Sequence, residues 1–190
     1  MRILVAEDET IIRLDLRDLL ERAGFEVCAE ARDGEEAVEL ARSERPDLAL
    51  MDVKMPRLDG IEAARRILDE RPIPIVMLTA YGQDELVSRA AEAGVFGYLV
   101  KPFREQDLLP AIATARARHE EMQAVRDEAE SLADALAARK VIERAKGLLM
   151  EKENLSEDEA FARLRRASQA SQRPLKVIAE AVVATLGGDG

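Results

Sequence analysis

The chain has few cysteines and few aromatic residues, and it lacks a long apolar run. Its 190 residues include one cysteine, one histidine and no tryptophan, and aromatic residues make up 3%. The single Cys28 excludes an intrachain disulfide. No apolar run approaches the roughly 18 residues of a membrane span, and the N-terminal stretch MRILVAEDE lacks the profile of a signal peptide. We therefore expect a soluble, cytoplasmic protein that does not associate with a membrane.

Charge is unevenly distributed along the chain. Residues 1–110 contain 24 acidic and 15 basic residues, a net −9, whereas residues 111–190 contain 14 and 13, a net −1. Within the second part, residues 139–176 carry 10 basic and 6 acidic side chains, a net +4. The overall charge of −10 argues against indiscriminate binding to nucleic acid but leaves room for a small basic face. This asymmetry predicts two units with different partners.

The first part alternates short apolar runs with amphipathic segments. The runs occupy 3–6, 25–30, 48–51, 73–79 and 97–100, and the segments with apolar residues at i, i+3 and i+4 occupy 10–24, 33–45, 60–70 and 84–94. Gly24 and Gly94 stand where helices are expected to end. This alternation predicts an α/β fold with a doubly wound, five-stranded parallel sheet. Ligands of such sheets bind at the carboxyl ends of the strands.

After Phe103 only helical patterns remain. Residues 105–152 predict one long helix, kinked or interrupted near Pro110. A 3-4-3-4 spacing on this helix, typical of a coiled-coil seam of about two heptads, is formed by Met122, Val125, Ala129, Leu132 and Leu136. A helix that lies on its own domain is the alternative.

Two shorter helices are predicted after the long one. Ser156, with Glu159 three residues later, is typical of a capping box that begins a helix. Pro174 stands near the first turn of the last helix, which Gly187 and Gly188 end. The end of the chain is therefore predicted to be a small, all-helical unit of three helices.

Polar residues follow four of the five predicted strands. Glu7 and Asp8 follow the first strand, Asp52 the third, Thr79 the fourth and Lys101 the fifth. Taken singly, each is typical of a turn or a cap, but together they would place three carboxylates at one sheet edge. Like charges so close raise a pKa or require a cation, and all-oxygen ligands favour Mg²⁺. With a hydroxyl and an ammonium nearby, Asp52 is the candidate nucleophile for an acyl phosphate.

Residues 1 to about 118 resemble a response-regulator receiver domain. The motifs that carry the resemblance are VAEDE, MDVKMPRLDG, LTAY and YLVKPF. The resemblance implies that Asp52 accepts phosphate from a sensor histidine kinase. It also implies a Mg²⁺ site formed by Glu7, Asp8, Asp52 and the backbone carbonyl of Lys54.

The receiver resemblance assigns roles to further residues as well. Thr79 and Lys101 are expected to hold the phosphoryl group, and Tyr98 is expected to swing inward when Thr79 moves. A cis peptide bond between Lys101 and Pro102 is also implied. A receiver of this kind catalyses only its own phosphoryl transfer and slow autodephosphorylation, so we do not expect an enzyme in the usual sense.

Residues 130 to about 186 resemble the ANTAR domain, a three-helix RNA-binding module of transcription antiterminators. The matching positions are Ala145-Lys146-Gly147, Leu149-Met150, Leu155, Ala160-Phe161, Leu164-Arg165, Arg173, Leu175 and Ala179. The stretch QRPL departs from the Asn-Arg-Lys-like start of the last helix, although Arg173 is kept. The whole chain is similar to actinobacterial receiver–ANTAR regulators. The expected division is a receiver at 1–118, a helical linker at 119–137 and an ANTAR domain at 138–190.

A basic face on the helical unit is the candidate for RNA binding. Its predicted members are Arg144, Lys146, Arg163, Arg165, Arg166, Arg173 and Lys176. Such a face binds phosphates, and unpaired bases can stack on guanidinium planes. From charge alone, a solvated helix face is the alternative. No aromatic platform is expected, because Phe161 is predicted to lie in the core.

The leading hypothesis is a phosphorylation-activated regulator that binds tandem RNA stem-loops in leader transcripts and acts in transcription antitermination. It is expected to form a homodimer when phosphorylated. A DNA-binding regulator is a second hypothesis, since basic three-helix units also build helix-turn-helix folds. A helical unit that only docks a protein partner is a third.

Overall fold

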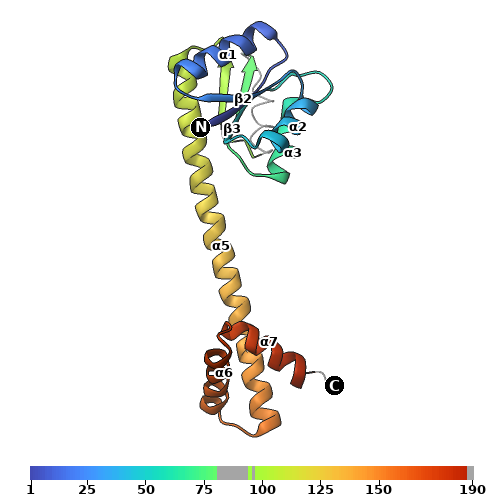
Figure 1. Cartoon of the computed structure of the whole chain (residues 1–190), viewed down its shortest axis with the longest axis vertical. Coiled ribbons are helices and arrows are strands. Elements are labelled where there is room, and N and C mark those ends of the chain that lie inside the picture. Colours follow the sequence, from blue (N-terminus) through green and yellow to red (C-terminus); the bar gives the residue numbers. More distant parts are fainter. Residues whose placement is uncertain (81–93, 96, 188–190) are drawn as a thin grey trace. The chain divides into compact units, whose positions relative to one another are not determined.

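The computed structural model describes residues 1–80, 94–95 and 97–187 (Figure 1). The chain divides into two compact units, Met1–Gln123 and Ala124–Gly190. The helix predicted at 84–94 lies outside the described residues except for its last residue. Among the described helices, none is both long enough and apolar enough to cross a membrane.

The first unit is built on a five-stranded parallel sheet with the order β2-β1-β3-β4-β5. The strands are β1 (Arg2–Ala6), β2 (Glu26–Ala31), β3 (Leu48–Asp52), β4 (Ile75–Ala80) and β5 (Gly97–Lys101). All four neighbouring pairs are parallel. The predicted doubly wound α/β fold is confirmed.

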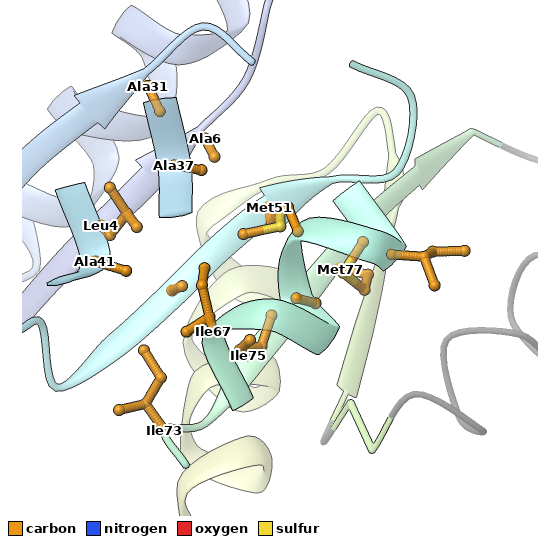
Figure 2. Packing of buried hydrophobic residues seen from close by; sticks show 14 of the residues in the cluster. Leu4, Ala6, Ala31, Ala37, Ala41, Met51, Ile67, Ile73, Ile75 and Met77 are labelled. Atoms are coloured by element: carbon orange, nitrogen blue, oxygen red, sulfur yellow. The ribbon is translucent and has the colours of Figure 1, made fainter. Parts of the chain in front are cut away.

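Two apolar clusters cover the opposite faces of the sheet. The helices involved are α1 (Thr10–Arg22), α2 (Gly34–Glu44), α3 (Gly60–Glu70) and the first turns of α5 (Glu105–Glu153). Because alternate residues of a strand face opposite sides, Leu4 packs in the cluster with α2 and α3, and Ile3 packs in the cluster with α1 and α5. Figure 2 shows the first cluster, with Ala41 of α2, Ile67 of α3 and Met51 of β3.

The loop after β3 is packed closely against the start of α3. The side chain of Asp59 caps this helix by accepting a 2.8 Å hydrogen bond from the backbone N–H of Glu62. A Cβ atom on Gly60 would lie 1.9 Å from the carbonyl oxygen of Asp52, so only glycine fits there. This close approach fixes the backbone that follows Asp52.

Helix α5 runs from Glu105 to Glu153 with Pro110 inside it, so the helix is not interrupted there, and the alternative of a kink at Pro110 stays a prediction. A proline inside a helix removes one hydrogen bond and costs about 3 kcal/mol or more. Leu108 and Ile112, on either side of the proline, are both buried in the second apolar cluster. Since burial of each contributes about 1.5–3 kcal/mol, packing on the sheet offsets the proline and keeps the helix continuous.

The apolar seam predicted on α5 is exposed. The exposed fractions are 48% for Met122, 63% for Val125, 60% for Leu132 and 61% for Leu136. Ala129 is exposed as well. Within the described part of the chain, these side chains are therefore not covered by their own domain.

The second unit packs three helices around a small core, as predicted. It consists of the end of α5, α6 (Glu157–Ser171) and α7 (Leu175–Leu186). Leu149 from α5, Leu164 from α6 and Ala179 from α7 meet in this core. Helix α7 follows Pro174 and ends at Leu186, with Gly187 as its C-cap, which agrees with the sequence signals at Pro174 and Gly187.

Two predictions for α6 had different outcomes. The capping box is confirmed, because the N–H of Glu159 donates to the Ser156 hydroxyl and the N–H of Ser156 donates to the Glu159 carboxylate. The prediction that Phe161 lies in the core is wrong, since 38% of this residue is exposed. The buried stripe passes instead through Ala160 and Leu164, which leaves the phenylalanine at the edge of the helix contact.

Candidate functional site

The polar residues predicted at the strand ends are brought together by the sheet. Strands β1, β3, β4 and β5 are consecutive neighbours, all parallel, so their carboxyl ends lie at one edge. Glu7 and Asp8 follow β1, Asp52 is the last residue of β3, Thr79 lies one residue before the end of β4, and Lys101 ends β5.

Glu7, Asp8 and Asp52 form a cluster of carboxylates. One carboxylate oxygen from each lies within 4.8 Å of the others. Glu7 is fully buried, Asp52 is 7% exposed, and Asp8 is exposed. Mg²⁺ prefers oxygen ligands and usually keeps several waters. Two buried carboxylates and one at the surface therefore fit a hydrated divalent cation.

The ammonium of Lys101 bridges the two buried carboxylates. Its Nζ lies 2.6 Å from Oε2 of Glu7 and 3.0 Å from Oδ1 of Asp52. Burial raises the pKa of both Glu7 and Asp52, and the lysine opposes this only in part. Burial alone would lower the pKa of Lys101, but hydrogen bonds to both carboxylates outweigh it and raise that pKa. Negative charge remains in excess, so the site favours a further cation.

The other residues predicted at this edge differ in exposure. Thr79 is 3% exposed, and its hydroxyl donates a 3.3 Å hydrogen bond to the carbonyl of Ala80. Tyr98 on β5 is 57% exposed. Lys54 lies in the loop two residues after Asp52, where its side chain is exposed. The peptide bond between Lys101 and Pro102 is cis, as predicted.

The basic residues predicted to contact RNA fall into three groups in the second unit. Arg144, Arg163, Arg165, Arg166 and Arg173 are exposed, Lys176 is half-buried and Lys146 is buried. Arg163 pairs with Glu153, and Lys176 lies 3.9 Å from Asp134. The remaining four arginines form no ion pair with any residue that the structure describes.

Lys146 is the buried member of this set, and its contact with RNA stays a prediction. It is 8% exposed, and its Nζ lies 2.6 Å from Oε1 of Glu157 and 3.0 Å from Oε2 of Glu143. Hydrogen bonds to these two carboxylates raise the pKa of the ammonium. The same Nζ lies 5.9 Å from the centre of the Phe161 ring. Lys146 thus joins α5 to α6 through both carboxylate and aromatic contacts.

Comparison with known proteins matches both units to families. Residues 3–113 match the family described as "Response regulator receiver domain", and residues 130–183 match the family described as "ANTAR domain". "Transcriptional regulatory protein PdtaR" of Mycobacterium tuberculosis is 50% identical over 186 residues, which cover 98% of this chain and 91% of PdtaR. The chain belongs to the receiver–ANTAR response regulators.

The receiver domain has further relatives. The chemotaxis protein CheY of Bacillus subtilis is 41% identical over 112 residues, 58% of this chain and 93% of CheY. The signal receiver domain of a modulated diguanylate cyclase from Desulfovibrio desulfuricans G20 has a TM-score of 0.59 at 34% identity, covering 64% of this chain and 97% of that domain. A receiver domain protein from Clostridium thermocellum gives a TM-score of 0.59 at 33% identity, covering 64% and 98%.

Arg13 of the receiver domain is a candidate site residue that the sequence analysis missed. It is 9% exposed, and its guanidinium donates a 2.6 Å hydrogen bond to the carbonyl of Glu7 and a 3.5 Å one to the carbonyl of Asp8. Its Nε lies 3.4 Å from Glu30 on β2. A signal was present, because Arg13 occupies the buried stripe of α1 together with Leu16 and Leu20. A charge inside an apolar stripe indicates a buried polar partner.

Replacement of Arg13 by methionine is expected to weaken Mg²⁺ binding by about 10-fold or more, as loss of an outer-shell partner does elsewhere. The guanidinium holds the backbone of Glu7 and Asp8, so its loss frees both carboxylates to move. Isothermal titration of Mg²⁺ measures the effect. Arg17→Met is the matched control, because Arg17 also pairs with Glu30, at 3.1 Å, without a described contact to those carbonyls.

An increase in Mg²⁺ affinity on replacement of Arg13 would contradict this prediction. Removal of a positive charge near the site strengthens cation binding if charge alone matters. Tighter Mg²⁺ binding by Arg13→Met than by Arg17→Met would therefore show that the residue does not position the acidic loop.

Proposed function

We propose that this response regulator is switched by phosphorylation of Asp52 and that its ANTAR domain then binds RNA. The observation that carries the first half is the Lys101 ammonium, 3.0 Å from Asp52, beside a carboxylate cluster at the edge where four strands end. An acceptor carboxylate, a cation site, a hydroxyl and an ammonium are the groups that phosphoryl transfer requires.

In the proposed reaction, a carboxylate oxygen of Asp52 attacks the phosphorus of a phosphohistidine on a sensor histidine kinase. A P–O bond forms, the P–N bond breaks, and the histidine leaves with the electron pair. The hydroxyl of Thr79 and the ammonium of Lys101 donate hydrogen bonds to the transferred phosphoryl oxygens. Thr79 is 3% exposed and the Lys101 side chain 16% exposed, so both groups lie largely shielded from bulk water at the edge where Asp52 ends its strand.

The proposed cation ligands are Glu7, Asp8, Asp52 and the backbone carbonyl of Lys54. When bound, Mg²⁺ supplies positive charge beside the phosphoryl oxygens. Tyr98, which is 57% exposed, is the proposed reporter of the switch, because it has room to turn inward once Thr79 moves toward the phosphoryl group. The receiver does no chemistry beyond this transfer and the slow hydrolysis of the acyl phosphate, in which water attacks and inorganic phosphate leaves.

The exposed arginines of the ANTAR domain support the second half of the proposal. Arg144, Arg165, Arg166 and Arg173 are solvent-accessible and have no ion pair among the described residues. Unpaired guanidinium groups bind phosphates and stack on bases. The expected ligand is a pair of RNA stem-loops in a leader transcript, and the expected outcome is transcription antitermination by a dimer.

Electrophoretic mobility shifts with an RNA probe and a DNA probe test this output. Phosphorylated protein is expected to bind an RNA of two stem-loops more tightly than duplex DNA of the same sequence, with affinity that falls as salt rises. Equal or tighter binding to DNA would favour the DNA-binding hypothesis. Failure to bind either nucleic acid would favour a helical unit that docks a protein partner.

A further inference from the structure

One side of α6 presents an aromatic ring followed by a guanidinium. Phe161 and Arg165 are four residues apart and therefore neighbours on the helix surface. Phe161 is 38% exposed, and Arg165 is exposed without an ion pair among the described residues. Ser168, seven residues after Phe161, continues this side and donates a 2.6 Å hydrogen bond to the carbonyl of Arg173. The ring and Arg165 thus follow one another along α6, and Ser168 ties the backbone of Arg173, just beyond the end of the helix, to the same side.

The Phe161 ring is oriented by a contact with the side chain of Lys146. The buried Nζ of Lys146 lies 5.9 Å from the ring centre, within the range of a cation–π contact. Lys146 is in turn fixed by Glu143 and Glu157. A ring that is oriented by such contacts and still partly open to solvent loses little freedom when a flat ligand covers it.

The neighbouring side of α6, which carries Arg166, lacks this combination. Arg166 lies about 100° around the helix from Arg165, and no aromatic residue stands one turn from it in the sequence. Arg163, one turn before Arg166, is already paired with Glu153. The two sides of α6 therefore differ in what they can bind, although both carry arginine.

We propose that an unpaired base of the RNA stacks on Phe161 while Arg165 and Arg173 hold the phosphates beside it. This inference rests on the proposed RNA binding and names the subsite that reads single-stranded loops. Loop bases can be splayed out and stacked on aromatic rings, whereas bases in a duplex cannot. The flanking guanidinium groups favour a nucleic acid over an apolar protein partner, which would leave Arg165 without a counter-charge.

Substitutions at Phe161 separate stacking from general apolar contact. The probe is a synthetic RNA of two hairpins with 2-aminopurine in the loops, bound by the full-length, phosphorylated chain. Phe161→Leu is expected to weaken binding about 5- to 150-fold, the range for loss of one stacked base, and to lose the quenching of 2-aminopurine fluorescence. Phe161→Trp is expected to retain both. Val177→Ala, at a residue that is likewise 38% exposed, is the control and is expected to bind as the parent does.

A pair of arginine variants tests which side of α6 is used. Arg165→Ala and Arg166→Ala remove the same charge from adjacent positions, so their general electrostatic effects on RNA binding are alike. Arg165→Ala is expected to weaken RNA binding 5-fold or more beyond the loss caused by Arg166→Ala, because it also removes about one charge-assisted hydrogen bond to the RNA. Circular dichroism establishes that each variant is folded.

Three results overturn the stacking subsite. If the parent binds RNA and Phe161→Leu binds equally well with unchanged quenching, the subsite is wrong while the RNA-binding function stands. An equal loss for Arg165→Ala and Arg166→Ala likewise removes the preference for one side. If the parent binds no RNA and instead captures a protein through this face, the proposed function fails as well.

Discussion

The Asp52→Asn variant is expected to accept no phosphate from acetyl phosphate or from a cognate kinase. Asparagine keeps the shape of the side chain but has no nucleophilic carboxylate oxygen. The loss should be complete rather than partial, because Glu7 is fully buried against Lys101 and cannot take over the role of acceptor. Phosphate labelling followed by gel electrophoresis measures this result.

The same variant is expected to be more stable than the parent in Mg²⁺-free buffer at neutral pH. Folding raises the pKa of Asp52, chiefly through burial. The ionised group therefore destabilises the folded receiver above its folded pKa, and this effect disappears below the unfolded pKa. Asparagine removes the charge, so the melting temperature should rise by about 2–4 °C for each kcal/mol relieved. Added Mg²⁺ should then stabilise the variant less than the parent.

Asp69→Asn is a suitable control for both measurements. Asp69 is exposed on α3, away from the carboxylate cluster, so this variant should take up phosphate and respond to Mg²⁺ as the parent does. Labelling of Asp52→Asn at the parent level would place the acceptor at another residue. A melting temperature that falls instead would mean that the contact with Lys101 outweighs the effect of burial.

The strand ends were predictable because they depend on short-range rules. Apolar runs predict the strands, and parallel neighbours place their carboxyl ends at one edge. The alternation of strands and helices is therefore enough to predict that Glu7, Asp52 and Lys101 lie close together, as they do in the structure. The capping box of α6 was predictable for the same reason, since its two partners are three residues apart.

Features that depend on distant partners were not predictable in this way. Arg13 is buried because backbone carbonyls before α1 accept hydrogen bonds from its guanidinium and a carboxylate on β2 forms an ion pair with it. Lys146 is buried because Glu157 arrives from the next helix. Phe161 is exposed because the smaller Ala160 occupies the helix contact. In each case the amino acid type suggests the opposite degree of burial, and the packing of neighbouring elements determines the burial that is observed.

Charged substitutions in the α5 seam are expected to abolish dimer formation by the phosphorylated protein. Leu132 and Leu136 are about 60% exposed in the single chain, and their spacing matches the seam of a coiled coil. Burial of each leucine against a second copy would contribute about 1.5–3 kcal/mol, whereas a glutamate there would have to be buried without a partner. Light scattering of the Leu132→Glu, Leu136→Glu double variant, with and without phosphorylation, measures the change.

Loss of the dimer should affect RNA binding only when two stem-loops are present. Two ANTAR domains held together bind a tandem RNA by avidity, so the double variant is expected to lose about 100- to 10,000-fold in affinity for the tandem RNA. Its affinity for a single stem-loop should stay unchanged, because the arginines of α6 are intact. In the parent, phosphorylation should raise affinity for the tandem RNA about 5- to 150-fold, the usual range of allosteric coupling.

Ser131→Glu is the matched control for the seam. It adds a charge to the same exposed stretch of α5, about 100° around the helix from Leu132, and should dimerise and bind tandem RNA as the parent does. If the double variant still dimerises, the interface lies elsewhere on the chain. If it is monomeric and yet binds tandem RNA as tightly as the parent, avidity does not operate, and the switch must act within a single chain.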